Sequence, residues 1–133
     1  MRRTVILSFI IFAIAFVGQA KEKKPSAPKP IIVEIDFGNG HEVKRVDVAC
    51  NKTITALEAL QKAADVKTHP VGSYVFVTSI DEVAAERGKM AWYYKVNGKK
   101  PKLAIEQPVK PGDTVSWRFV EDVCSKKVDG PTK

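Results

Sequence analysis

Two short aromatic segments, each beside a turn signal, constrain the fold of this chain more than any other feature. The first is residues 92–98, Trp-Tyr-Tyr-Lys-Val-Asn-Gly, and the second is residues 111–117, Pro-Gly-Asp-Thr-Val-Ser-Trp. Aromatic and β-branched residues favour strands, whereas Asn-Gly and Pro-Gly-Asp favour tight turns. Val115, Trp117 and Phe119 also alternate with polar residues, which predicts one buried face. The two segments therefore predict strands at the centre of a small β-rich domain.

The beginning of the chain has the pattern of an export signal. Arg2 and Arg3 precede an apolar run, residues 5–17, which is followed by the small residues Gly18 and Ala20. This order is typical of a signal peptide, so we expect residues 1–20 to be removed and the protein to be periplasmic or extracellular. The alternative is an uncleaved anchor, although the run is shorter than the ~20 residues of a membrane span.

The remaining chain divides into a linker, one domain and a tail. Residues 21–30 are rich in Lys and Pro and predict a disordered linker. The folded domain is expected over residues 31–124, and a flexible tail over residues 125–133. The length allows one domain, and no internal repeat is evident.

The positive charge lies mostly outside the predicted domain. The full chain carries +7, and removing Arg2 and Arg3 leaves +5, of which four lysines and one glutamate in residues 21–30 contribute +3. This linker allows weak attraction to anionic envelope polymers or lipid headgroups. No Lys/Arg stripe is interleaved with aromatic residues, so the sequence does not support nucleic-acid binding.

Two cysteines, Cys50 and Cys124, lie in the predicted domain. In an exported protein such a pair can oxidise, and we expect one intrachain disulfide. Two free thiols or a bridge between chains are the alternatives. No metal-ligand spacing accompanies the pair, so we expect no metal site.

The hydrophobic pattern predicts the order strand, strand, helix, strand, strand, strand. The first two strands, residues 31–37 and 41–50, form a hairpin across Gly38-Asn39-Gly40, and Val43 is out of phase, which predicts a bulge near Lys44-Arg45. A helix follows over residues 54–65, capped by Thr53 or by a Thr55–Glu58 capping box. The later strands are residues 74–80, 91–96 and 114–120. The first of these has apolar residues on both faces at its start, which fits a central or helix-covered position.

This order predicts an α+β fold, with one helix packed on a mixed sheet in a β-grasp, or ubiquitin-like, arrangement. The first and last strands of such a sheet are parallel neighbours. Cys50 and Cys124 would then lie at opposite ends of the sheet, beyond the ~4.4–6.8 Å between Cα atoms that a disulfide needs. The predicted topology and the predicted disulfide therefore conflict unless the tail folds back.

Four segments with fitting spacing resemble one known family. They are residues 53–60 (Thr-Ile-Thr-Ala-Leu-Glu-Ala-Leu), 77–81 (Val-Thr-Ser-Ile-Asp), 92–98 and 111–117. Together they resemble the small domains similar to the C-terminal domain of transcobalamin and intrinsic factor, which many exported bacterial proteins carry with no assigned function. Glu82 departs from that pattern, since a Gly commonly follows the Asp there.

The resemblance implies a binding or interaction module. In the vitamin carriers this domain is one half of a cobalamin clamp, whose helical barrel has no counterpart in this chain. A lone domain would bury only part of so large a ligand, so no cofactor is expected and cobalamin is disfavoured. We expect a non-enzymatic module for a small molecule or glycan, and the alternative is a structural or protein-interaction domain of the cell envelope.

The candidate binding surface surrounds the strand at residues 91–96. An aromatic, a cation and an amide on one strand are groups that a small-ligand or glycan surface uses. The alternative is that Trp92 packs in the core, that Tyr93 lies partly exposed and that Asn97 serves its turn. His41 and His69 are lone histidines without a nucleophile at motif spacing, so no catalytic residue is expected. The tentative ligand-binding residues are Arg87, Met90, Trp92, Tyr93 and Asn97.

Overall fold

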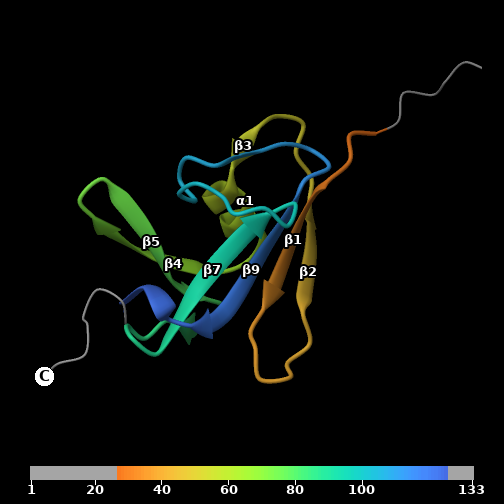
Figure 1. Ribbon diagram of the computed structural model, residues 1–133. Helices are drawn as coiled ribbons and strands as arrows, with labels where there is room; N and C mark the ends of the chain where they lie inside the picture. The colour runs from red at the N-terminus through yellow and green to blue at the C-terminus, as the bar shows by residue number, and fades with distance from the viewer. Residues whose placement is uncertain (1–26, 126–133) are drawn as a thin grey trace, which may run out of the picture.

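The computed structural model describes residues 27–125, and its main feature is a four-stranded mixed sheet (Figure 1). The strands are β1 (Ile31–Asp36), β2 (Lys44–Val48), β7 (Met90–Val96) and β9 (Thr114–Glu121), in the order β2-β1-β9-β7. β1 pairs antiparallel with β2 and parallel with β9, and β7 pairs antiparallel with β9. The predicted α+β fold with one helix and a mixed sheet is confirmed, including the parallel first and last strands.

The helix that packs on the sheet, α1 (Ala56–Ala63), begins at a capping box. Thr55 Oγ1 accepts the Glu58 N–H at 3.1 Å, and a Glu58 carboxylate oxygen accepts the Thr55 N–H at 2.7 Å. The Thr53 alternative is therefore wrong, and the helix ends two residues earlier than predicted. A two-stranded ribbon, β3 (Ile54–Thr55) with β8 (Pro108–Val109), holds its N-terminal end. No described helix is long and apolar enough to cross a membrane.

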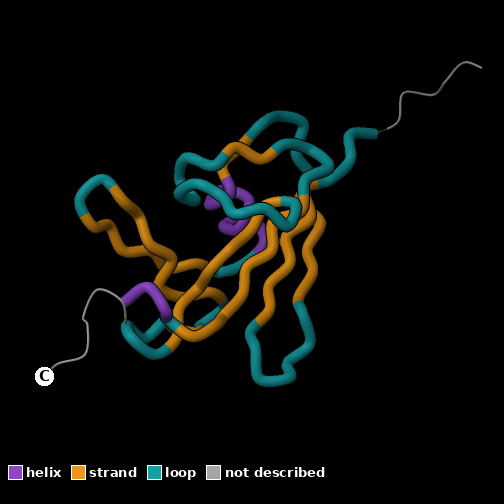
Figure 2. The backbone as a smooth tube through the Cα atoms, in the orientation of Figure 1, coloured by secondary structure: helices purple, strands orange, loops and turns teal. Residues whose placement is uncertain are grey.

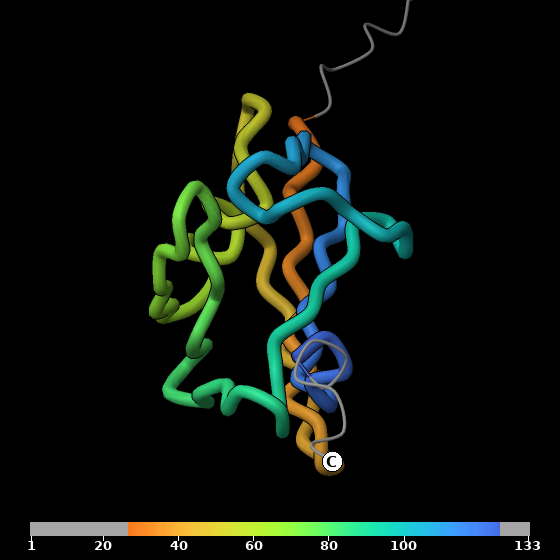
Figure 3. Tube along the Cα trace, turned by 60° about the vertical axis from the view of Figure 1, so that its left-hand side comes forward, coloured from red at the N-terminus to blue at the C-terminus, as the bar shows by residue number. Residues whose placement is uncertain are grey.

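Alternation of apolar residues along the strands builds the core against α1. Ile31, Val33 and Ile35 of β1 are fully buried, as is Val115 of β9. From the helix, Ala56, Ala59 and Leu60 are fully buried as well. Figure 3 shows α1 and the chain that follows it on one side of the four strands. The sheet therefore has a core face toward α1 and a polar face away from it.

A second sheet, which the sequence did not predict, lies beside the first. Its strands are β4 (Val66–Val71), β5 (Tyr74–Ile80) and β6 (Val83–Ala84), in the order β4-β5-β6. The β4–β5 hairpin projects from the body of the domain (Figure 2). Residues 74–80 were wrongly predicted as a doubly buried central strand, since Tyr74 and Phe76 are about half exposed.

Turns with positive φ connect several of these strands. Asn97 (φ 50°) and Gly98 (φ 73°) turn the chain after β7, as Asn-Gly predicted. Asp81 (φ 46°) and Glu82 (φ 69°) join β5 to β6, so Glu82 adopts a left-handed conformation that favours glycine. The bulge predicted near Lys44 is absent, because β2 begins at Lys44 and Val43 is a loop residue, 49% exposed.

The predicted Cys50–Cys124 disulfide is not formed, and both thiols are free. Cys50 follows the end of β2, which lies beside the start of β1, whereas Cys124 follows the end of β9, which lies beside the end of β1. The two cysteines therefore lie at opposite ends of the sheet. The boundary at residue 20 and most of the predicted tail fall outside the described residues.

Candidate functional site

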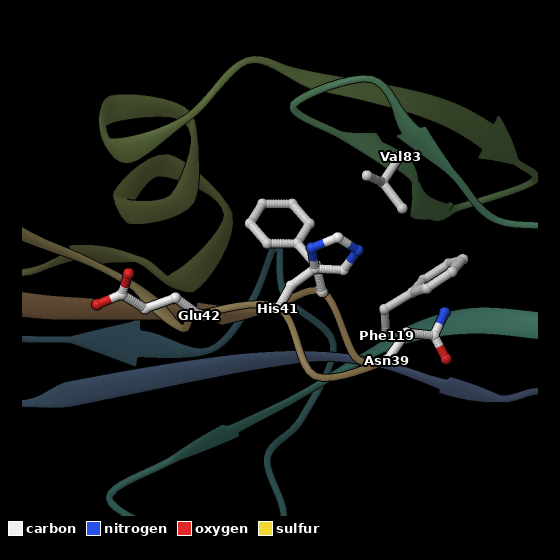
Figure 4. Close-up of a pocket in the computed structure, with 6 residues that line it drawn as sticks. Asn39, His41, Glu42, Val83 and Phe119 are labelled. Atoms are coloured by element: carbon white, nitrogen blue, oxygen red, sulfur yellow. The ribbon is translucent and has the colours of Figure 1, made fainter.

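A cleft of about 380 Å³ opens at the end of the sheet where β1 and β9 finish. Its walls come from the loop after β1, from the end of β9 and from β6. Figure 4 shows these side chains around the opening, with Val83 facing the loop from the opposite side. The lining residues are Phe37, Asn39, His41, Glu42, Val83 and Phe119.

The loop between β1 and β2 takes its shape from Gly38-Asn39-Gly40. All three residues have positive φ, and Asn is one of the few side chains that tolerates this conformation. A Cβ on Gly38 would lie 3.2 Å from the Phe119 carbonyl oxygen, so glycine allows the loop to pack against β9. The Gly38 N–H donates to the Asp36 carboxylate at 2.9 Å. These contacts hold the Phe37 and His41 side chains at the cleft.

Aromatic rings form the floor of the cleft. Trp92 lies between Phe37, with ring centroids 5.7 Å apart and nearly perpendicular planes, and Phe119, with centroids 4.9 Å apart. Its indole N–H donates to the Val83 carbonyl oxygen at 3.0 Å. Trp92 is only 8% exposed, so it supports the floor from beneath and braces both walls.

The rim of the cleft consists of polar side chains. Asn39, His41 and Glu42 are all exposed, and their side chains make no hydrogen bond or ion pair within the described part of the chain. In Figure 4 the Glu42 carboxylate points away from Val83 and Phe119. Asn39 and His41 are therefore the rim residues best placed to hydrogen-bond a molecule that rests on the aromatic floor.

The structure does not bring the five sequence-predicted residues into one site. Trp92 faces α1, whereas Tyr93 lies on the opposite face of β7, as strand alternation requires. Arg87 and Met90 lie at the start of β7, and Asn97 follows its far end. Asn97 Oδ1 accepts the Thr114 N–H at 2.9 Å, which is a role in the turn.

Tyr93 is tied to a residue that the sequence analysis did not single out, Asp122. The Tyr93 hydroxyl donates to Asp122 at 3.3 Å, and burial raises the pKa of Tyr93 to about 12. Asp122, only 5% exposed, also accepts the N–H groups of Ser125 at 3.0 Å and Gly88 at 2.9 Å. Hydrogen bonds from Ser125, then from Gly88, hold the pKa of Asp122 well below its usual range. This carboxylate fastens the C-terminal turn to the turn before β7.

Comparison with known proteins identifies a family. Residues 54–121 match "Domain of unknown function (DUF4430)". The chain belongs to the DUF4430 family. The match runs from β3 to β9, so it includes Val83, Trp92 and Phe119 but not the β1–β2 loop that carries His41. No curated protein matches the chain.

A solved structure has a similar fold. It is a protein from Ruminococcus gnavus, described as a "putative metal binding protein", with 23% sequence identity and a TM-score of 0.57. The similarity covers 70% of this chain and 97% of that chain. At this identity the likeness concerns the fold alone.

Proposed function

We propose that this chain is an exported, non-enzymatic binding module that takes a small molecule or the end of a glycan in the cleft beside Trp92. The observation that carries the proposal is a cleft of about 380 Å³ with an aromatic floor and an unpaired polar rim. Ligand sites in proteins are typically ~300–1,000 Å³, apolar, and supplied with a few polar groups. The apolar face of a sugar or heterocyclic ring can rest on Phe37 and Phe119, while Asn39 and His41 bond its polar edge.

Several observations support binding rather than catalysis. The lining residues include no Ser, Thr, Cys or Lys that could act as a nucleophile beside His41, and the Glu42 carboxylate points away from Val83 and Phe119. The resemblance to transcobalamin C-terminal domains also favours a ligand-binding role. A whole corrinoid is far larger than this cleft, so our proposal concerns a smaller ligand and involves no cofactor. The signal-like pattern of residues 1–20 supports export.

Metal binding is not part of the proposal. The described residues contain no group of three or more His, Cys, Asp or Glu side chains that could hold a metal ion. His41 and Glu42 would supply two ligands, and Figure 4 shows their side chains pointing in different directions. The description of the Ruminococcus gnavus protein is therefore not extended to this chain.

A matched pair of histidine variants tests the cleft. We would screen corrinoids, sugars and short peptides by thermal shift, then measure the affinity of each hit by calorimetry for His41→Ala and His69→Ala. Both histidines are exposed, but His69 lies on the β4–β5 hairpin. We expect at least tenfold weaker binding in His41→Ala and unchanged binding in His69→Ala. Loss of binding in Tyr93→Ala, but not in His41→Ala, would place the ligand on the opposite face and refute the cleft.

The second candidate is a protein-interaction domain of the cell envelope, which the β4–β5 hairpin favours. Val71, Tyr74 and Phe76 are each about half exposed and share one face of this hairpin. Exposed apolar groups that gather in one place are typical of interaction sites. Capture of one discrete envelope protein by the wild type, lost in Phe76→Ser and kept in His41→Ala, would favour this role.

A further inference from the structure

Exposed lysines gather at the end of the domain opposite the cleft. This end holds the start of β1, the end of β2, the turn after β7 and the turn before β9. Figure 2 shows loops gathered there, where residues 27–30 lead into β1. All six lysines of this Lys-rich end are exposed: Lys29, Lys52, Lys99, Lys100, Lys102 and Lys110.

Contacts between the turns and strand ends hold these lysines close together, although they are up to 81 positions apart in the sequence. The Lys29 side chain lies beside Gly112, since a Cβ on Gly112 would be 3.8 Å from it. Asn97 joins the two turns, because its amide donates to Asp113 at 3.0 Å. Lys52 precedes β3, whose Ile54 pairs with Val109 next to Lys110.

The charge of the Lys-rich end is poorly neutralised. None of its six lysines forms an ion pair among the described residues. Of the nearby acids, Asp113 accepts the Lys110 N–H and Glu58 accepts the Thr55 N–H. That Thr55 hydrogen bond, and to a smaller extent the charge of Lys52, lowers the pKa of Glu58, so Glu58 partly offsets one of the six lysines. At the cleft end, by contrast, Lys44, Lys89 and Arg118 are each paired with a carboxylate. The domain is therefore polarised along its strands.

We propose that the Lys-rich end docks on an anionic lipid surface and holds the cleft facing away from it. The choice of lipid follows from where the chain enters: β1 begins at this end, and the residues that precede it include Lys21, Lys23 and Lys24, which remain after the expected removal of residues 1–20. Clusters of basic residues are typical of binding to anionic headgroups. This orientation keeps the opening of the cleft in solvent.

The test compares two triple variants of the full chain with the same change in charge. Lys99, Lys100 and Lys102 are changed together to Gln in the first variant. The control changes Lys62, Lys67 and Lys89 to Gln, which are exposed lysines away from the Lys-rich end. Binding is measured by sedimentation with vesicles of phosphatidylcholine alone or mixed with phosphatidylglycerol. The neutral vesicles account for any binding by the N-terminal apolar run.

We expect the wild type to prefer the anionic vesicles and to lose this preference as salt is added. A headgroup contact contributes about fivefold per lysine, so the first variant should bind anionic vesicles roughly a hundredfold more weakly. The control should lose less than about tenfold. Equal losses in the two variants, or no preference for anionic vesicles, would overturn the proposal. Stronger binding to immobilised dextran sulfate than to vesicles, lost in the first variant, would overturn the choice of lipid.

Discussion

The same substitution at the two tryptophans on the core face of the main sheet should change the free energy of unfolding by different amounts. Trp92 is 8% exposed and its indole N–H donates to the Val83 carbonyl oxygen. Trp117 is 2% exposed, and its indole N–H has no hydrogen-bond partner among the described residues. Changing each to Phe removes the N–H and part of the ring, but keeps an aromatic ring against its neighbours.

The expected changes in unfolding free energy follow from these contacts. Each Trp→Phe change loses about 1–2 kcal/mol of packing. Trp92→Phe also loses its hydrogen bond, about 1–2 kcal/mol, and should cost roughly 3 kcal/mol in total. Trp117→Phe removes a buried unpaired donor whose desolvation costs about 1–3 kcal/mol, so the two effects nearly cancel. We therefore expect Trp117→Phe to lie within about 1 kcal/mol of the wild type.

Urea unfolding followed by far-UV circular dichroism measures both values. Each variant keeps one tryptophan, so fluorescence gives a second probe of the same transition. The dependence of the free energy on urea should be unchanged, since the surface exposed on unfolding is nearly the same. The Tyr94 ring, stacked on Trp117 with centroids 4.6 Å apart, stays in contact with a Phe ring. Equal losses in the two variants, or a larger loss in Trp117→Phe, would refute the reasoning.

Three further predictions concern a turn, an ion pair and the thiols. Glu82→Gly should raise the free energy of unfolding by about 0.5–1 kcal/mol, because Glu82 has φ 69°, and a lower urea midpoint would contradict this. The Lys44 ammonium, 2.6 Å from Asp81, holds the pKa of that carboxyl below its usual value. The stability that this ion pair contributes is present above the unfolded pKa of about 3.9 and is lost as pH falls through the lower folded pKa. In acid, the free energy of unfolding of Asp81→Asn should therefore fall less steeply with pH than that of the wild type. Alkylation without reductant should label both cysteines, exposed Cys124 before Cys50, whereas labelling only after reduction would indicate a disulfide.

The sequence correctly predicts those elements in which the local residue pattern agrees with the burial and backbone conformation that the fold requires. In β1, apolar residues alternate with Glu34 and Asp36, and the structure buries every apolar residue of one face. The turn at Asn97-Gly98 has positive φ at both residues, as this dipeptide favours. The helix begins at the Thr55–Glu58 capping box, although two starts fit its pattern equally well.

The β4–β5 hairpin could not be predicted from the sequence, because strands that are largely exposed lack the alternation of apolar and polar residues. β4 contains Pro70 and is almost entirely exposed, so it lacks the alternation that identifies a strand. Its partner β5 carries apolar residues on both faces, which usually indicates burial on both sides. Here Val75 and Val77 pack against the core, while Tyr74 and Phe76 face solvent. Periodicity alone cannot separate these two arrangements.

The candidate cleft could not be found from the sequence, because its lining residues come from three separate segments, residues 37–42, residue 83 and residue 119. Phe119 and Val83 look like ordinary core residues in their own strands, and Gly38-Asn39-Gly40 looks like an ordinary turn. Only the parallel pairing of β1 with β9 brings the loop after β1 against Phe119. His41 has no local signal that distinguishes it from an ordinary surface histidine.

The family match covers only part of the residues that line the cleft. The DUF4430 match, residues 54–121, contains Val83, Trp92 and Phe119, whereas Phe37, Asn39 and His41 lie before it. Strands β6 and β9 therefore supply one side of the cleft, and the chain that follows β1 supplies the other. Because loops tolerate substitution more readily than packed strands, a change of ligand would require replacement of residues 39–42 alone. Exchanging these four residues for a Gly/Ser segment of equal length, with Gly38 retained, should therefore remove ligand binding while leaving the unfolding free energy nearly unchanged.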